Sequence, residues 1–463
     1  MRQGRKLWVL LVALIVAALA APAFAEVQNV KVGGDITVRG IWRANFDLRD
    51  DSNFITTGTS DAQKFIFSTV GINLTADLTD NVSADIRLSN QRDWGGNANT
   101  GLGNSSLNVD VSRAYVTMKE MLYSPLTIRL GRQPLWFGKG FIVGSRLLAG
   151  DFDPNTSFSA DEFTDQTGFD AIRATLDFNP ATIDVVYAKV FEGNAASDND
   201  INLTGINAGY KFSSMNGEVE GYYWNVHNSA VSSALGPAGL KPTIVNTVGF
   251  RGSVEPVANS SFWGESAIQW GDIGGLASTT QRAWAFDFGG DYTLADVAWT
   301  PKLGVEWIFY SGGSKDSAGN GWNPIFRGKF ETLIREFQAA GLYPTDTPSD
   351  TNSTTNEHQL AFFGAVKPTD SIKLDSRVTV FAADTGIRIG NNIGARSKTP
   401  HYIGSEWDTK ATYDYTEDVQ IGLIYGVFWP GDVFRHVSGT DAPLSPGGKP
   451  IAQELVSTVS VKF

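Results

Sequence analysis

The chain has 463 residues, with 49 glycines, 28 phenylalanines, 13 tryptophans and no cysteine, and its formal charge is −12 at pH 7. The absence of cysteine excludes a disulfide scaffold, a thiolate metal site, a cysteine nucleophile and an acylated lipoprotein. The acidic balance argues against nucleic acid as a partner, and an aromatic content of 12% argues against intrinsic disorder.

The start of the chain has the pattern of a secretory signal. Basic residues open it, an apolar stretch covers 7–19, and an Ala-x-Ala motif ends at Ala25. A membrane anchor is the alternative, but this stretch is short for a helical span, which needs about 20 apolar residues. We therefore expect a signal peptide at 1–25 and one mature domain, a transmembrane barrel, at 26–463.

Alternation of apolar and polar residues recurs from Val32 to Phe463. Successive side chains of a strand point to opposite faces, so each segment has one apolar face and one polar face. The pattern predicts about 18 strands. The predicted strands are 32–48, 63–79, 81–92, 108–120, 125–134, 166–178, 181–191, 201–213, 215–228, 243–256, 258–271, 281–295, 297–311, 357–369, 371–383, 401–416, 418–429 and 451–463.

The connections distinguish a membrane barrel from a soluble β-sandwich. Short turns, such as 79–81 and 179–181, alternate along the chain with long connections. Bacterial outer-membrane barrels have tight periplasmic turns and long external loops, whereas a sandwich has no reason to show this asymmetry. We expect an all-β fold, a single transmembrane antiparallel β-barrel of outer-membrane type with both termini on the periplasmic side. The terminal Phe463, which shares a face with Val459 and Val461, is typical of a barrel-closing strand.

The long connection 135–165 is a candidate constriction of the pore. Porin-like barrels commonly fold one long loop inward, and four glycines between 138 and 150 would allow tight turns here. Lys139 and Arg146 give the connection positive charge. The alternative is a loop that faces outward.

The same connection contains a spacing that fits a calcium loop. Asp151, Asp153, Asn155 and Glu162 fall at ligand positions of the calcium-loop template, where the hard cation requires oxygen ligands. Thr156 stands where that template has glycine, and Asp and Asn are also common in solvated turns. Two interpretations stay open, a calcium site that fixes the width of the pore and an ordinary polar loop; we assign no metal ligand.

The other long external connection, 312–356, contains apolar residues at helical spacing from Phe326 to Phe337. This spacing predicts an amphipathic helix with charged residues on its opposite face. Three roles are open for it: a lid in the barrel mouth, a docking surface for a partner, or a loop with its own small apolar contact.

Two regions of the sequence resemble bacterial alginate export proteins. One is IRLGRQPLWFGKGFIVGSR at 128–146, followed by the strand at 167–176. The other is GSEWDTKATYDYTEDVQIGLIYGVFWPG at 404–431. The resemblance extends over the whole mature chain. It implies a monomeric, porin-like barrel of about 18 strands that passes a solute across the outer membrane of a Gram-negative bacterium.

Strand alternation places both basic and acidic side chains on the lumen face. A polyuronate exporter should present a cationic lumen, whereas here the acids are at least as numerous as the bases. The alternative to solute binding is therefore structural ion pairing between neighbouring strands. The functional interpretation requires an unpaired strip, for which we expect Arg39, Arg43, Arg129 and Arg377. The candidate pore-lining and substrate-binding residues are Arg39, Arg43, Arg87, Arg113, Arg129, Arg132, Lys139, Arg173, Arg377, Lys410, Glu406 and Asp408.

The sequence contains no motif for catalysis. It has no Gly-x-Ser-x-Gly and no His-Glu-x-x-His, and the segment 310–315 lacks the spacing of a phosphate-binding loop. We expect no catalytic residue and no cofactor. The expected function is an outer-membrane channel for an anionic saccharide or another small hydrophilic solute, with membrane lipid as the other partner. The alternative is a structural or partner-binding barrel that acts as the sheath or anchor of an outer-membrane assembly.

Overall fold

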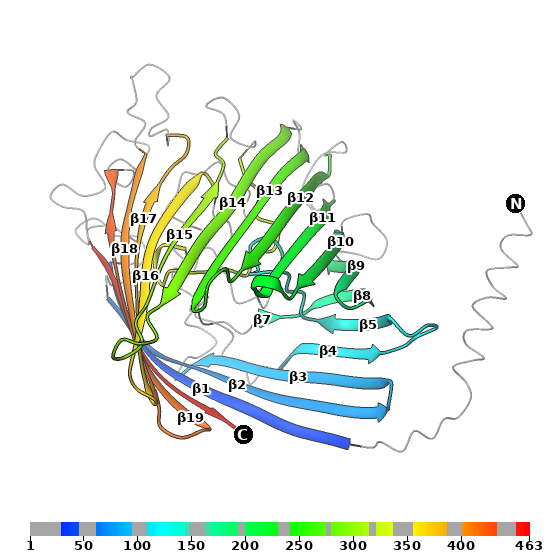
Figure 1. Cartoon of the computed structure of the whole chain (residues 1–463), viewed down its shortest axis with the longest axis horizontal. Coiled ribbons are helices and arrows are strands. Elements are labelled where there is room, and N and C mark those ends of the chain that lie inside the picture. Colours follow the sequence, from blue (N-terminus) through cyan, green and yellow to red (C-terminus); the bar gives the residue numbers. More distant parts are fainter. Residues whose placement is uncertain are drawn as a thin grey trace, which may run out of the picture.

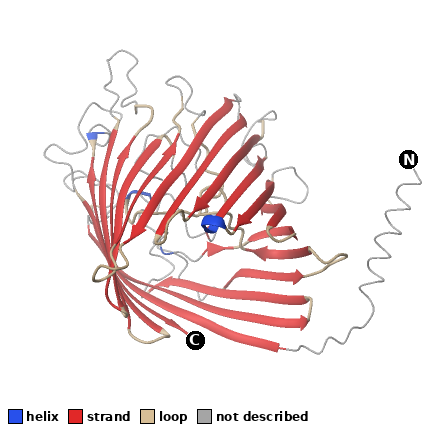
Figure 2. Ribbon diagram, in the orientation of Figure 1, coloured by secondary structure: helices blue, strands red, loops and turns tan. Residues whose placement is uncertain are grey.

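The structure is a computed structural model in which eighteen antiparallel strands form one sheet that closes on itself (Figure 1). No helix in the described part of the chain is long and apolar enough to cross a membrane. Strands make up almost all of the regular structure (Figure 2). The described residues are 29–45, 62–94, 109–144, 146–147, 163, 166–192, 200–229, 241–274, 279–313, 321–336, 355–386, 401–432 and 451–463.

The strand positions confirm the predicted all-β barrel, and each predicted strand has its counterpart. A separate two-stranded ribbon, β6 (Arg146–Leu147) and β7 (Gln166–Thr167), and a 3-10 turn, η3 (Ser214–Asn216), complete the described elements. The barrel strands are β1 (Asn29–Ala44), β2 (Ala62–Thr79), β3 (Val82–Asp93), β4 (Asp110–Met118), β5 (Leu126–Gln133), β8 (Phe169–Asp177), β9 (Ala181–Phe191), β10 (Ile201–Phe212), β11 (Gly217–Asn228), β12 (Thr243–Val254), β13 (Ser260–Ile273), β14 (Thr279–Thr293), β15 (Lys302–Tyr310), β16 (Glu357–Thr369), β17 (Ile372–Ala382), β18 (Tyr402–Asp414), β19 (Val419–Pro430) and β20 (Ala452–Lys462).

The barrel closes where β1 pairs with β20, and this seam leaves no open sheet edge. Gly34 and Phe463 exchange two backbone hydrogen bonds, of 2.8 and 3.0 Å. An added Cβ at Gly34 would lie 2.8 Å from the ring of Phe463, so the last side chain packs directly on the glycine backbone. The terminal aromatic residue is therefore part of the seam.

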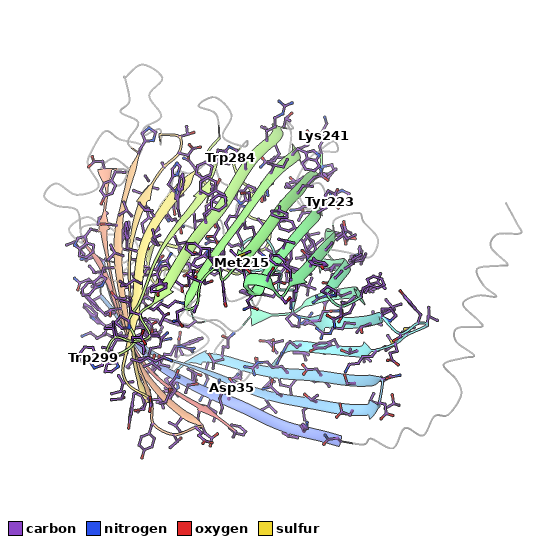
Figure 3. The ribbon with its side chains drawn as sticks, viewed as in Figure 1. Asp35, Met215, Tyr223, Lys241, Trp284 and Trp299 are labelled. Carbon is purple, nitrogen blue, oxygen red and sulfur yellow. The ribbon has the colours of Figure 1, made fainter. Side chains whose placement is uncertain are left out.

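The two faces of the wall differ as the alternation predicts. On β20, Val459 points outward and is 45% exposed, whereas its neighbour Ser460 points inward and hydrogen-bonds Thr37 at 3.0 Å. Tryptophans lie at both ends of the barrel wall: Trp284 near the end with the long connections, and Trp299 in a turn at the opposite end (Figure 3). Exposed apolar side chains between two aromatic belts fit an outer face that contacts lipid.

Candidate solute pathway

Two segments between barrel strands fold into the lumen and pack on each other. They are 134–144, which follows β5, and 321–336, which lies between β15 and β16. Val143 and Phe326 form a parallel β-bridge, and the N–H of Gly144 donates to the carbonyl of Phe326 at 2.8 Å. None of the side chains in 321–336 is fully exposed, so the barrel wall and the other segment enclose this one.

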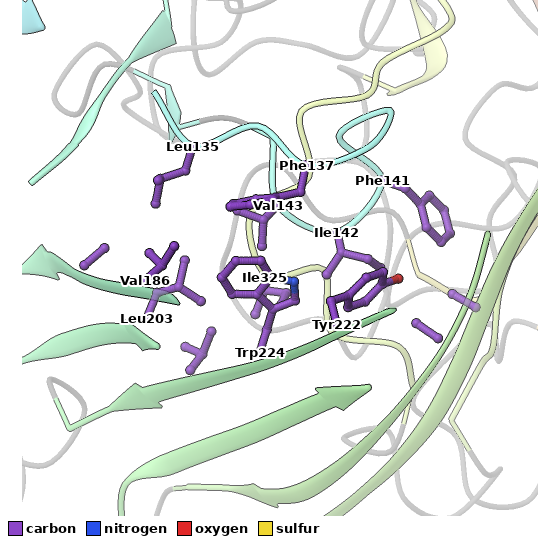
Figure 4. Packing of buried hydrophobic residues seen from close by; sticks show 14 of the residues in the cluster. Leu135, Phe137, Phe141, Ile142, Val143, Val186, Leu203, Tyr222, Trp224 and Ile325 are labelled. Carbon is purple, nitrogen blue, oxygen red and sulfur yellow. The ribbon is translucent and has the colours of Figure 1, made fainter. Parts of the chain in front are cut away.

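An apolar cluster holds the first segment against the inner wall (Figure 4). The ring of Phe137 lies 4.8 Å from the ring of Trp224, which is fully buried. Burial of this much apolar surface stabilises the inward position. The expected inward fold of 135–165 is confirmed for 135–144; the calcium-like spacing at 151–162 lies outside the described residues. The labelled members of the cluster are Leu135, Phe137, Phe141, Ile142, Val143, Val186, Leu203, Tyr222, Trp224 and Ile325.

The two segments cross through glycines, backbone against backbone. An added Cβ at Gly144 would lie 2.5 Å from the Cα of Gly140, and one at Gly328 would lie 2.5 Å from the carbonyl carbon of Gly144. The N–H of Gly328 donates to the carbonyl of Gly140 at 2.8 Å. No side chain larger than hydrogen fits at this crossing without movement of the backbone.

Charged groups fix the second segment to the wall. The ammonium of Lys329 lies 2.5 Å from carboxylate oxygens of both Asp287 on β14 and Glu306 on β15. Burial lowers the pKa of Lys329, but these two carboxylates outweigh burial and hold the pKa above its ordinary value. Arg377 on β17 binds the same Glu306 at 2.7 Å and reaches Glu331 of the segment at 3.4 Å.

Further along the segment, wall carboxylates bind its backbone and side chains. Glu406 on β18 accepts the N–H groups of Ile334 and Arg335 at 2.6 and 2.8 Å. The guanidinium of Arg335 binds Glu357 on β16. The predicted amphipathic helix is wrong over 326–334, where the backbone is not helical. The reason is that side chains and backbone groups of this segment bind partners on the barrel wall.

Six of the ten basic residues predicted for the site are paired with carboxylates. This pairing contradicts the expected unpaired strip at Arg43 and Arg377. Arg43 and Glu406 are fully buried and offer no surface to a solute. The ion pairs are Arg43–Glu454 (2.8 Å), Arg87–Asp35 (2.6 Å), Arg113–Asp85 (3.9 Å), Arg132–Asp170 (2.8 Å), Arg173–Asp184 (2.7 Å) and Arg377–Glu306 (2.7 Å).

The remaining basic candidates are Arg39, Arg129, Lys139 and Lys410. Among the described residues, no carboxylate lies within 4.0 Å of Arg129, Lys139 or Lys410. Arg39 hydrogen-bonds Thr69 at 3.3 Å. The last candidate, Asp408, lies beside Glu406 on the inner face of β18 and is partly buried.

Aromatic rings support two of these cations. The guanidinium of Arg129 lies 5.6 Å from the ring centroid of Tyr115, and the ammonium of Lys139 lies 3.1 Å from that of Trp263. Burial, followed by repulsion from Lys329, lowers the pKa of Lys139 to about 8. Lys139 therefore keeps its positive charge at neutral pH, and no described carboxylate lies within 4.0 Å of it.

The charged residues of the second segment are not among the predicted site residues. Arg327, Lys329 and Arg335 alternate with aromatic and aliphatic residues in a long connection. Basic side chains interleaved with apolar ones are unusual in a solvated loop, and this pattern was the available signal of burial inside a charged lumen.

Comparisons with known proteins show a family match and several barrels of similar fold. A family model described as alginate export matches residues 35–446. No curated protein sequence matches the chain. Among solved structures, OccK9 (OpdG) of Pseudomonas aeruginosa has a TM-score of 0.55 at 10% identity, over 94% of this chain and 99% of that one. A BenF-like porin from Pseudomonas fluorescens Pf-5 has a TM-score of 0.52 at 10% identity, over the same shares.

A third structure, OpdQ of Pseudomonas aeruginosa, has a TM-score of 0.52 at 11% identity and covers 94% of this chain and 98% of that chain. At such identities these likenesses concern the fold alone. The family match covers most of the chain, from the first barrel strand, β1, to the connection that precedes the last strand, β20. The chain therefore belongs to the alginate export family, and it is a channel-forming β-barrel of the Gram-negative outer membrane.

Proposed function

We propose that this channel passes small hydrophilic anions, and that Arg129 and Lys139 give the lumen its preference. The proposal rests on the contacts of these two side chains. Both cations lie against aromatic rings, and no described carboxylate lies within 4.0 Å of either. A cation that stacks on a ring keeps its charge and its hydrogen-bond donors for a passing anion.

A further basic residue, Arg173, adjoins Arg129 and the inward segment. Arg129 on β5 is the direct cross-strand neighbour of Arg173 on β8, whose guanidinium lies 5.0 Å from the ring centroid of Phe137. Lys139 follows on the same inward segment. Arg173 is paired with Asp184, so Arg129 and Lys139 supply the positive potential along the path. The family name adds an anionic polysaccharide, alginate, to the candidate solutes.

Ion selectivity tests the proposal. Reversal potentials in planar bilayers under a potassium chloride gradient should show an anion preference for the wild-type channel. Exchange of both cations, Arg129→Gln with Lys139→Gln, should move the reversal potential toward cations. Lys64→Gln is the matched control, because Lys64 lies exposed on the outer face. A cation-selective wild-type channel, or no shift in the double variant, refutes the proposal. A barrel that serves only as a sheath or anchor would show no discrete conductance steps.

We further propose that a signal peptide, 1–25, is removed, that 26–463 folds as one monomeric barrel, and that the barrel transports without catalysis. Mass spectrometry of the purified protein tests the cleavage after Ala25, and light scattering in detergent tests the monomer.

A further inference from the structure

A cavity of about 700 Å³ lies inside the barrel, between the two inward segments and the inner face of β13 to β19. This volume falls in the range of about 300–1,000 Å³ that small-molecule sites occupy. Lys139 and Phe330 line it from the segments, and Trp263, Phe363 and Lys410 line it from the wall.

Most of the charged groups around this cavity already have partners in the protein. The groups left for a ligand are therefore few, and they include the carboxylate oxygens of Asp408. Lys139 and Lys410 are the exceptions among the described basic residues of the lining, since no described carboxylate lies within 4.0 Å of either. The internal ion pairs are Lys302–Asp291 (2.9 Å), Lys373–Asp375 (2.6 Å) and Arg377–Glu306 (2.7 Å).

Aromatic rings supply much of the remaining surface. Phe163, Trp263, Phe330 and Phe363 all line the cavity, and each ring is only partly buried. Each carries a cation near one face, at centroid distances of 5.1, 3.1, 4.5 and 5.6 Å. The cavity thus offers flat apolar surfaces beside the ammonium group of Lys139, which stacks on Trp263 and has no described carboxylate within 4.0 Å.

We propose that this cavity binds a small carboxylate that carries an aromatic ring, with the carboxylate on the ammonium of Lys139 and the ring against Trp263 and Phe363. Lys410 provides a second cation on the wall. This inference rests on the proposed anion channel and narrows its solute. A sugar acid of the same charge gains less at this position, because its hydroxyl groups would be desolvated against the rings of Trp263 and Phe363.

Channel block by benzoate tests the assignment, with glucuronate as the comparison of equal charge. In single-channel recordings, benzoate should interrupt the chloride current at concentrations about 10-fold lower than glucuronate, and Lys139→Gln should raise the blocking concentration about 10- to 100-fold. Lys139→Arg should retain much of the block because it keeps the positive charge. Lys64→Gln should leave it unchanged.

Equal or stronger block by glucuronate refutes the aromatic ligand, and so does unchanged benzoate block in Lys139→Gln. A heat-modifiable band on gels verifies that each variant has folded. If the wild-type channel prefers anions but benzoate does not block it, the cavity assignment fails and the proposed function stands. If the channel prefers cations, the proposed function itself fails.

Discussion

The ion pair between Arg43 and Glu454 should be a main determinant of barrel closure. It spans the seam between β1 and β20, where the two residues are direct cross-strand neighbours. The N–O distance is 2.8 Å, and the side chains are 1% and 0% exposed. At an effective dielectric constant of about 20, the attraction at this distance is about 6 kcal/mol. Loss of one partner leaves the other charge buried and uncompensated, which costs about 3–5 kcal/mol.

Arg43→Met should therefore lower the free energy of unfolding by about 3–5 kcal/mol, whereas Arg43→Met with Glu454→Met should lose far less. The reason is that the double variant buries two apolar side chains and no unpaired charge. Urea unfolding in detergent micelles, followed by tryptophan fluorescence, measures both. A coupling energy of about 2–3 kcal/mol is expected from the cycle. Additive losses would refute the reasoning, since they would mean that neither charge depends on the other.

Three further perturbations follow from the lumen and the seam. Because the pKa of Lys139 is about 8, its ammonium is present below pH 8 and lost above it, so anion selectivity should fall between pH 7 and pH 9. Lys139→Gln should weaken this dependence of the reversal potential on pH, and an unchanged dependence would argue against a role for Lys139. Glu406→Ala removes the acceptor of two buried N–H groups, at a local cost of about 2–4 kcal/mol, so bilayer recordings should show a larger and noisier conductance. The control Glu417→Ala, at an exposed position, should leave the conductance unchanged, and unchanged conductance steps in Glu406→Ala would argue that Glu406 does not anchor the second segment. Gly34→Val should lower the yield of heat-modifiable barrel, since its Cβ would lie 2.6 Å from the carbonyl oxygen of Gly71; a normal yield would show that the seam adjusts.

The wall of the barrel was predictable because its determinants are local. Period-two alternation fixes which side chains face outward, and short turns fix where each strand ends. Val459 and Ser460 illustrate this, since their opposite faces follow from adjacent positions alone. The sequence did not predict the β6–β7 ribbon, because two residues in each strand are too few to show a period.

The interior was less predictable because its determinants are distant in sequence. The apolar spacing around Phe330 fits a helix, and only the wall partners of Lys329 and Arg335 show why the backbone is extended instead. The roles of the lumen arginines likewise depend on register. Arg43 and Arg129 look alike in the sequence, but Arg43 faces Glu454 across the seam and Arg129 faces Arg173.

The crossing of Gly140, Gly144 and Gly328 makes the bore of the channel adjustable in one direction only. Substitutions elsewhere in a constriction can enlarge an aperture by shortening a side chain, but here the contact is already between backbones and nothing remains to be shortened. Any replacement adds volume and wedges the segments apart or narrows the passage. A wider channel therefore has to arise by releasing the segments from the wall, at the cost of their ion pairs. Permeability is thus tied to anchorage, because the ion pairs that hold the two segments to the wall also limit the width of the channel.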